Sequence, residues 1–240
     1  MKFIKPLILA SSVLIITPSC DVLTQLPNMN TNLPLTEAEV SAGLKEALTV
    51  GIRNAVTQTS ATDGYYGNSL IKIPFPEEAQ RVKTTLTNLG LNSLVDDFEE
   101  SMNHAAEQAS KKATDIFVDA ITKMTINDAM GILNGNQDAA TQYLQRTTES
   151  QLISEFEPII NSALEQGNVT QYWTEITTKY NQIPFVTPVQ TDLTGYVTEK
   201  AIDGLFVMVA KEEREIRENP QARINAILKR VFGSLDSPTY

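Results

Sequence analysis

The chain has 240 residues, a formal net charge of −10 at pH 7, one cysteine and one histidine. So acidic a chain does not bind nucleic acid or an anionic lipid surface through bulk charge. One cysteine excludes a disulfide framework and a structural zinc site built from cysteine and histidine ligands. Apolar residues make up 42 % of the chain, which is enough for a packed core without disulfides.

The first 19 residues have the pattern of a bacterial export signal. Lys2 and Lys5 make the start positive, and an apolar run of about ten residues follows before Cys20. A membrane-spanning helix needs roughly 20 apolar residues, so permanent spanning is the weaker interpretation. We expect residues 1–19 to be a lipoprotein-type signal peptide and Cys20 to be acylated, for example with palmitate. Secretion with a free thiol and a retained anchor are the alternatives, because Thr17 and Pro18 depart from the usual processing site.

Residues 20–35 are expected to form the lipidated cysteine and a flexible tether. This stretch has no apolar period and contains three asparagines and two prolines. The expected location is the bacterial cell envelope, with the protein held at a membrane through Cys20 and facing the periplasm. The sequence does not distinguish the inner from the outer membrane.

Residues 36–233 are predicted to form a single all-α domain, a multi-helix bundle with one short extended segment near residues 70–76. Thr36 and Glu39 form a capping-box pattern that begins a helix over 36–58. Pro74 and Pro76 favour an extended segment or an edge strand. A helix over 77–89 follows and ends at Gly90. One apolar stripe then continues at helical spacing from residue 92 to residue 124.

The second half is also helical in pattern. Thr125 and Asp128 begin a short helix that ends near Gly135. Further helices are predicted at 137–147, 149–166, 170–182 and 193–218, with Pro158 as a kink or break. A last helix is expected from Pro220 to Phe232, and residues 234–240 are expected to be a frayed tail.

Several sequence blocks resemble an uncharacterised bacterial family, domain of unknown function 4197. The blocks are Gly43–Leu48, Ile71–Pro76, Met102–Ala109, Asp128–Leu144 and Asp192–Gly233. The resemblance implies an envelope-exported helical domain. It transfers no catalytic role to any residue.

His104 is the only histidine, so any histidine-based chemistry must use it. Glu100, His104 and Glu107 share a helical face at spacings i, i+4 and i+7, which suits an acid–base group or a weak metal site. The alternative is a polar stripe on a long helix, and we favour it. Asn103 lies one turn from Glu107 and is a candidate member of a buried polar network. We expect no metal site and no cofactor.

The loop at residues 63–68 is the best loop candidate for ligand binding. Tyr65 and Tyr66 can form a pocket wall, while Asn68 and Lys72 supply an amide and a cation. Asn103 is the fifth ligand-binding candidate. The alternative is a packed turn whose tyrosines lie over the bundle.

The most plausible function from the sequence is a binding domain for an envelope protein or for an apolar small molecule held between helices. Two alternatives stay open. One is a hydrolase or lyase-type enzyme that uses Glu100, His104 and Glu107, and the other is a structural spacer. The sequence does not identify the ligand, the partner or the oligomeric state.

Overall fold

The computed structural model describes residues 35–88, 90, 92–167, 169–181, 188–189, 192–219 and 229–230. The chain divides into two compact units, Met1–Pro34 and Leu35–Tyr240, and every described residue belongs to the second. The expected signal peptide, Cys20 and nearly all of the tether lie outside the described residues. So do most of the predicted helix at 220–232 and the tail at 234–240.

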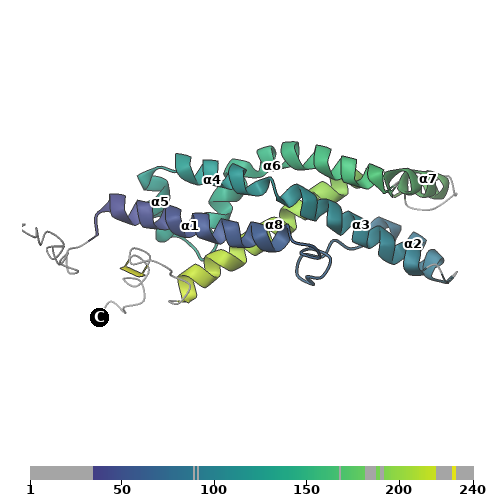
Figure 1. Ribbon diagram of the computed structural model, residues 1–240, viewed down its shortest axis with the longest axis horizontal. Helices are drawn as coiled ribbons and strands as arrows, with labels where there is room; N and C mark the ends of the chain where they lie inside the picture. The colour runs from purple at the N-terminus through teal and green to yellow at the C-terminus, as the bar shows by residue number, and fades with distance from the viewer. Residues whose placement is uncertain are drawn as a thin grey trace, which may run out of the picture. The chain divides into compact units, whose positions relative to one another are not determined.

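The described part of the chain is all-α and contains no strand, which confirms the predicted fold class (Figure 1). One 3₁₀ turn, η1 (Glu77–Ala79), precedes the second helix. The helices are α1 (Glu37–Thr59), α2 (Gln80–Asn88), α3 (Asn92–Ser110), α4 (Ala113–Lys123), α5 (Ile126–Leu133), α6 (Ala139–Gln166), α7 (Val169–Asn181) and α8 (Leu193–Glu218).

Local capping sets the starts of three helices. Thr36 and Glu39 form the predicted capping box of α1, and Thr125 and Asp128 form that of α5. Hydrogen bonds from the capping threonines hold the pKa of the Glu39 and Asp128 carboxyls below their ordinary values. At α8, the Asp192 side chain accepts from the Gly195 N–H at 2.8 Å.

Two predicted boundaries were wrong. The stripe from 92 to 124 is interrupted at Lys111 and Lys112, so that α3 packs mainly on α6 and α8 while α4 packs on α1 and α6. The predicted helices at 137–147 and 149–166 are one helix, α6, with Pro158 inside it. Pro158 is exposed, so the carbonyl that loses its helical hydrogen bond lies on the solvent side of the helix.

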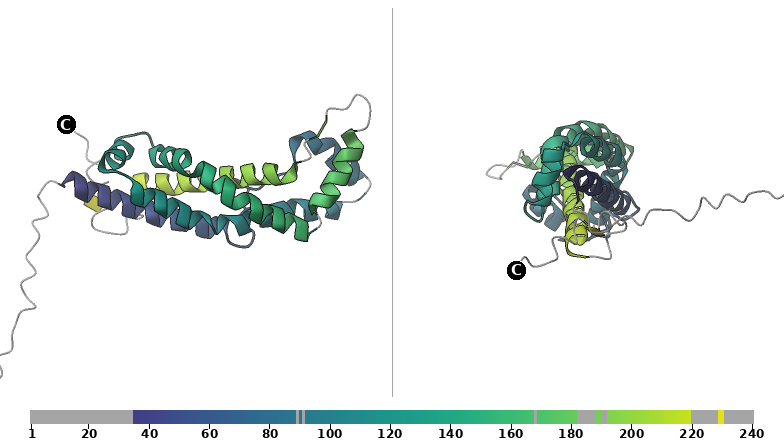
Figure 2. Two further views of the ribbon diagram at one scale, coloured as in Figure 1. Left: turned by 90° about the horizontal axis from the view of Figure 1, so that it is seen from above. Right: turned by 90° about the vertical axis from the view of Figure 1, so that its left-hand side faces the viewer.

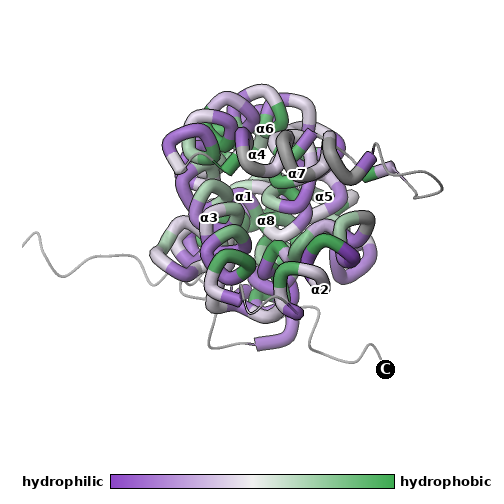
Figure 3. Tube along the Cα trace, turned by 90° about the vertical axis from the view of Figure 1, so that its right-hand side faces the viewer, coloured by the Kyte–Doolittle hydropathy of each residue, from purple (hydrophilic) through white to green (hydrophobic). Residues whose placement is uncertain are grey.

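Helix α8 is the most enclosed of the long helices. Thirteen of its 26 residues are buried, and it packs against α1, α3, α6 and α7 (Figures 1 and 2). Helices α2 and α7 lie at one end of the domain and α5 at the other (Figure 1). Seen from the α2 and α7 end, hydrophobic segments lie among the helices and hydrophilic ones lie outside (Figure 3).

A buried ion pair joins three helices near the α5 end. The Glu213 carboxylate accepts from the Ala140 and Thr141 N–H groups at 3.0 and 2.8 Å, which caps the start of α6. Arg217 donates to Glu213 at 2.9 Å and to the Ile132 carbonyl at 2.9 Å, which caps the end of α5. Two side chains of α8 therefore bind the free backbone groups at the start of α6 and the end of α5, which gives the Glu213 carboxylate a structural role.

Candidate functional site

Helix α3 has one face made of buried polar residues. Glu99, Asn103 and Glu107 are spaced by four residues, so they lie on the same side of the helix. All three bind the backbone of the segment between α1 and α2, at residues 65–75. We call these three residues, with the backbone they bind, the polar seam.

Asn103 binds both backbone groups of Ile73, within the segment predicted to be extended. Its Oδ1 accepts from the Ile73 N–H at 2.8 Å, and its Nδ2 donates to the Ile73 carbonyl at 2.9 Å. Nδ2 also donates to the Glu99 carbonyl at 2.7 Å. One buried amide therefore satisfies both backbone groups of Ile73, as a neighbouring strand would. Within the predicted extended segment near residues 70–76, Leu70 and Ile71 lie in a turn closed by hydrogen bonds to the Asn68 carbonyl, and residues 72–76 form neither helix nor strand. No edge strand is found in the described part of the chain.

The two carboxylates complete the seam. Glu107 accepts from the N–H groups of Tyr65 and Tyr66 at 3.0 and 3.3 Å. Glu99 accepts from the Phe75 N–H at 3.2 Å and from Lys83 Nζ at 2.6 Å. Both glutamate residues are at most 7 % exposed. The N–H donors of each carboxylate stabilise its negative charge. Both backbone donors bind Glu107 through Oε1, while its Oε2 lies 3.8 Å from His104 Nε2.

Tyr65 anchors the loop to α8. The side chain is fully buried, its hydroxyl donates to the Ala201 carbonyl at 2.6 Å, and it accepts from Ser110 Oγ at 3.3 Å. Burial raises the pKa of the Tyr65 phenol, and the Glu107 charge adds to the effect. A Cβ at Gly204 would lie 2.7 Å from Tyr65 Cε1, so the glycine allows this approach. A ligand has no access to Tyr65 or Asn103, both of which are 0 % exposed.

The remaining loop candidates contact the same elements. Lys72 Nζ lies 4.1 Å from the Tyr66 ring centroid and 3.6 Å from Glu99 Oε2. Asn68 Nδ2 lies 3.7 Å from Met208 Sδ on α8, and Asn68 Oδ1 accepts from the Leu70 N–H at 3.1 Å. The structure brings the five loop and helix candidates together against α3 and α8. The polar contacts of these side chains named above are all made within the protein.

His104 lies at the edge of the seam, among three carboxylates. Its Nε2 is 3.2 Å from Asp63 Oδ1, 3.8 Å from Glu107 Oε2 and 4.0 Å from Glu100 Oε1. Glu100, His104 and Glu107 therefore do converge, and the fold adds Asp63. A shallow cavity of about 200 Å³ adjoins His104 and Glu107.

The groups nearest to His104 in the described ranges are carboxylates. In the described ranges no hydroxyl group hydrogen-bonds to His104, and no group of three histidine, cysteine or acidic side chains is arranged to hold a metal ion. A nucleophile beside its base is the signature of covalent catalysis. Glu107, moreover, already accepts from two backbone donors. The arrangement fits an ion-pair cluster that holds Asp63 against α3.

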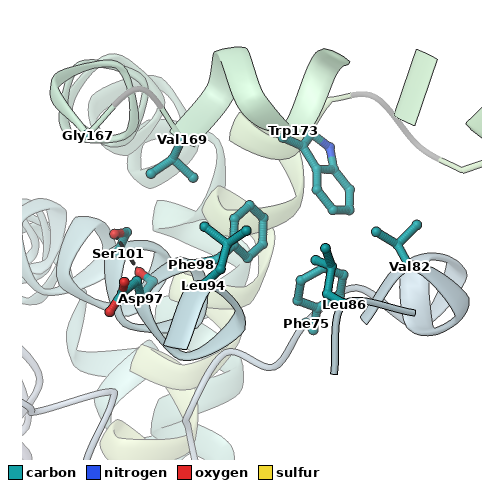
Figure 4. Close-up of a pocket in the computed structure, with 10 residues that line it drawn as sticks. All are labelled: Phe75, Val82, Leu86, Leu94, Asp97, Phe98, Ser101, Gly167, Val169 and Trp173. Atoms are coloured by element: carbon teal, nitrogen blue, oxygen red, sulfur yellow. Dashed lines mark hydrogen bonds between the residues drawn. The ribbon is translucent and has the colours of Figure 1, made fainter. Parts of the chain in front are cut away.

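The nearly opposite face of α3 lines an open pocket of about 350 Å³ (Figure 4). Helices α2 and α7, the segment before η1 and the end of α6 complete it. The lining residues are Phe75, Val82, Leu86, Leu94, Asp97, Phe98, Ser101, Gly167, Val169 and Trp173. The volume and apolar lining are in the range typical of small-molecule sites.

Three aromatic rings from three elements form the wall of this pocket. The Phe98 centroid lies 4.9 Å from that of Phe75 and 5.3 Å from that of Trp173, and the Phe75 and Trp173 centroids are 5.7 Å apart. These separations are typical of packed aromatic pairs. Leu94 at the mouth remains 46 % exposed. Phe75 and Trp173 are only 3 % and 2 % exposed, so most of the open apolar surface of the pocket belongs to the other lining residues.

Figure 4 shows that the pocket has a polar and an apolar end. Asp97 and Ser101 lie at one end, near Gly167, while Val82, Leu86 and Trp173 lie at the other. Ser101 Oγ donates to the Asp97 carbonyl at 2.7 Å. Leu94 and Phe98 lie in the apolar stripe predicted over residues 92–124, which indicates a helix face but not a pocket. The only advance signal was the lone tryptophan, because the pocket joins residues from distant segments.

The fold and the site define an all-α domain with a polar seam and an apolar pocket on two faces of one helix. The family model described as "Protein of unknown function (DUF4197)" matches residues 34–233, so the chain belongs to this family. The resemblance inferred from the sequence blocks is thereby confirmed. No curated protein and no solved structure matches the chain. Among the described residues, no helix is long and apolar enough to cross a membrane.

Proposed function

We propose that this protein is a lipid-anchored envelope protein whose helical domain binds an apolar small molecule in the pocket between α2, α3 and α7. The observation that carries the proposal is the open pocket of about 350 Å³, whose apolar walls include Leu94, which is 46 % exposed, along with the nearly buried Phe75 and Trp173. Burying apolar surface contributes about 25 cal/mol per Å², so an apolar ligand gains affinity from these walls. No cofactor is needed for such binding.

The support for the anchor is the pattern of residues 1–20, with its positive start, its apolar run and Cys20. Intact mass of the protein from membrane and soluble fractions tests it. We expect an acylated species that begins at Cys20 in the membrane fraction, and its loss in Cys20→Ala. An unmodified soluble chain in the native host would contradict the anchor and leave the binding proposal to be tested separately.

The two alternatives have weaker support. An enzyme based on Glu100, His104 and Glu107 would use a carboxylate that is fixed through its Oε1 by two backbone N–H groups, which fits a structural role for Glu107. A structural spacer has no use for an open aromatic pocket, whose unfilled volume forgoes packing contacts. A binding role accounts for both observations.

Trp173 makes the proposal directly testable, because it is the only tryptophan in the chain and lines the pocket. The assay uses residues 20–240 with Cys20→Ala, which retains the compact unit from Leu35 onward and needs no detergent. We expect 1-decanol, a neutral apolar probe, to change the Trp173 emission with a saturable binding curve. The absence of saturable binding by decanol and by other neutral apolar probes of similar size would overturn the proposal.

A matched pair of variants locates the binding. Leu94→Asp places a negative charge at the pocket mouth and should weaken decanol binding about ten-fold. The bound alkyl chain would displace water from the new carboxylate, and removing water from a charged group is costly. Ile126→Asp makes the same change at another exposed apolar residue, at the start of α5, and should leave binding unchanged. Equal losses in both variants would place the binding elsewhere.

A further inference from the structure

The polar end of the pocket indicates which kind of apolar molecule it accepts. Among the ten lining residues, Asp97 is the only charged one. It lies at the end of the pocket away from Val82 and Trp173, so a ligand whose apolar body fills the aromatic end places its other end near this carboxylate (Figure 4).

The second polar group at this end is also ready to accept a hydrogen bond. The Ser101 hydroxyl donates its hydrogen to the Asp97 carbonyl at 2.7 Å, which leaves the lone pairs of Oγ for a ligand donor. An ionised carboxylate is an acceptor only. Both side chains at this end therefore favour a donor or a cation and disfavour an anion.

The helix ends near this part of the pocket do not reverse that preference. Gly167 follows the last turn of α6, where helix-end carbonyls carry partial negative charge, and Val169 begins α7, where N–H groups carry partial positive charge. These partial charges are of opposite sign and similar size, so they largely offset each other. The full charge of Asp97 then decides the sign of the local field.

We propose that the pocket selects amphiphiles with an apolar body and a cationic head, with Asp97 as the residue that determines this specificity. The inference rests on the proposed binding function and names its ligand class. It separates alkylamine-like ligands from fatty acids and from phosphate-bearing lipids, whose anionic heads would face the carboxylate.

Three probes of equal chain length test the inference by Trp173 emission: decylamine, 1-decanol and decanoate. Asp97 is exposed, so water screens its charge, and we expect decylamine to bind about two- to five-fold more tightly than decanol. Decanoate should bind more weakly than decanol by a similar factor. Raising the ionic strength should shrink both differences.

Two variants separate Asp97 from the acidity of the whole chain. Asp97→Asn should abolish the preference for decylamine while leaving decanol affinity unchanged. Asp96→Asn removes the same charge from the neighbouring exposed residue, which does not line the pocket, and should keep the preference.

The outcomes are distinct for the two proposals. Equal binding of all three probes, tightest binding of decanoate, or equal loss of preference in both variants would overturn the role of Asp97 and leave the binding function standing. If no probe binds saturably, the binding function fails and the inference fails with it.

Discussion

Helix α3 has two faces that differ in how completely their groups are satisfied. On the seam face, Glu99, Asn103 and Glu107 are buried, and each accepts backbone N–H groups from residues 65–75. On the pocket face, Leu94, Phe98 and Asp97 border an open volume of about 350 Å³. Polarity alone would have suggested the reverse assignment. A satisfied polar cluster stabilises a fold, while unfilled apolar surface is what a ligand can still gain from.

Phe75, which precedes η1 and α2, contacts both faces of α3 and so connects the seam to the pocket. Its backbone N–H donates to Glu99 in the seam, and its ring packs on Phe98 and Trp173 in the pocket. The seam therefore positions one wall of the pocket. Substitutions on the two faces should have opposite signatures, with the seam affecting stability and the pocket affecting binding.

The largest effect is expected in the seam. Asn103→Ala removes the partner of both the N–H and the carbonyl of Ile73, which lie in the buried interior. Each orphaned group costs about 1–3 kcal/mol, so the free energy of unfolding should fall by about 2–6 kcal/mol in urea titrations. Gln108→Ala, at an exposed position on the same helix, should change it by less than about 0.5 kcal/mol. Similar values for both variants would contradict a structural role for the seam.

The pocket should show the opposite signature. Leu86→Phe adds volume to a half-buried lining residue of α2, so decanol affinity measured by Trp173 emission should fall about ten-fold. Filling open space should leave the free energy of unfolding unchanged or raise it by up to about 1 kcal/mol. Leu70→Phe makes the same change at an exposed site outside the pocket and should affect neither quantity. Unchanged decanol binding in Leu86→Phe would separate the pocket from ligand binding.

Tyr65 joins the seam to α8 through one hydrogen bond. Tyr65→Phe should lower the free energy of unfolding by about 1 kcal/mol at neutral pH, because the Ala201 carbonyl loses its donor.

The same variant has a signature in alkali. The pKa of Tyr65 in the fold is raised above its ordinary value of 10.0, so deprotonation favours the unfolded chain. Wild-type stability should decline as the pH rises above about 10, and Tyr65→Phe should decline less steeply. Tyr66→Phe, at the neighbouring half-buried residue, should keep the wild-type slope, and a flattened slope there would remove the assignment to Tyr65.

The smallest effect concerns the exposed capping boxes, which belong to neither face. Hydrogen bonds from Thr36 and Thr125 lower the pKa of Glu39 and Asp128 from their ordinary values of 4.5 and 3.8. Their stabilisation is therefore complete above these values and is lost as the pH falls through the lowered ones. In Glu39→Gln with Asp128→Asn, Tm should vary less between pH 5 and pH 2 than in wild type. Glu37→Gln, in the same first turn as Glu39, should keep the wild-type profile.

The sequence alone determined what depends on contacts between neighbours in the chain. The capping boxes at Thr36 and Thr125 join residues three apart, and the bounds of α8 match the predicted 193–218 because caps and apolar period agree there. The two wrong boundaries, at Lys111 and at residue 148, are places where packing against other helices overrode the local pattern.

Only the tertiary structure decided the roles of the polar and aromatic residues. Whether Asn103 is a ligand contact or a backbone partner depends on Ile73, which is 30 residues away. Whether Phe98 lies in a core or at a pocket depends on α7, which supplies Trp173 and stops short of filling the space. Side-chain type and helical spacing restrict which face a residue occupies, but the groups that meet that face come from distant segments. The fold class was therefore readable from the chain, while the site was not.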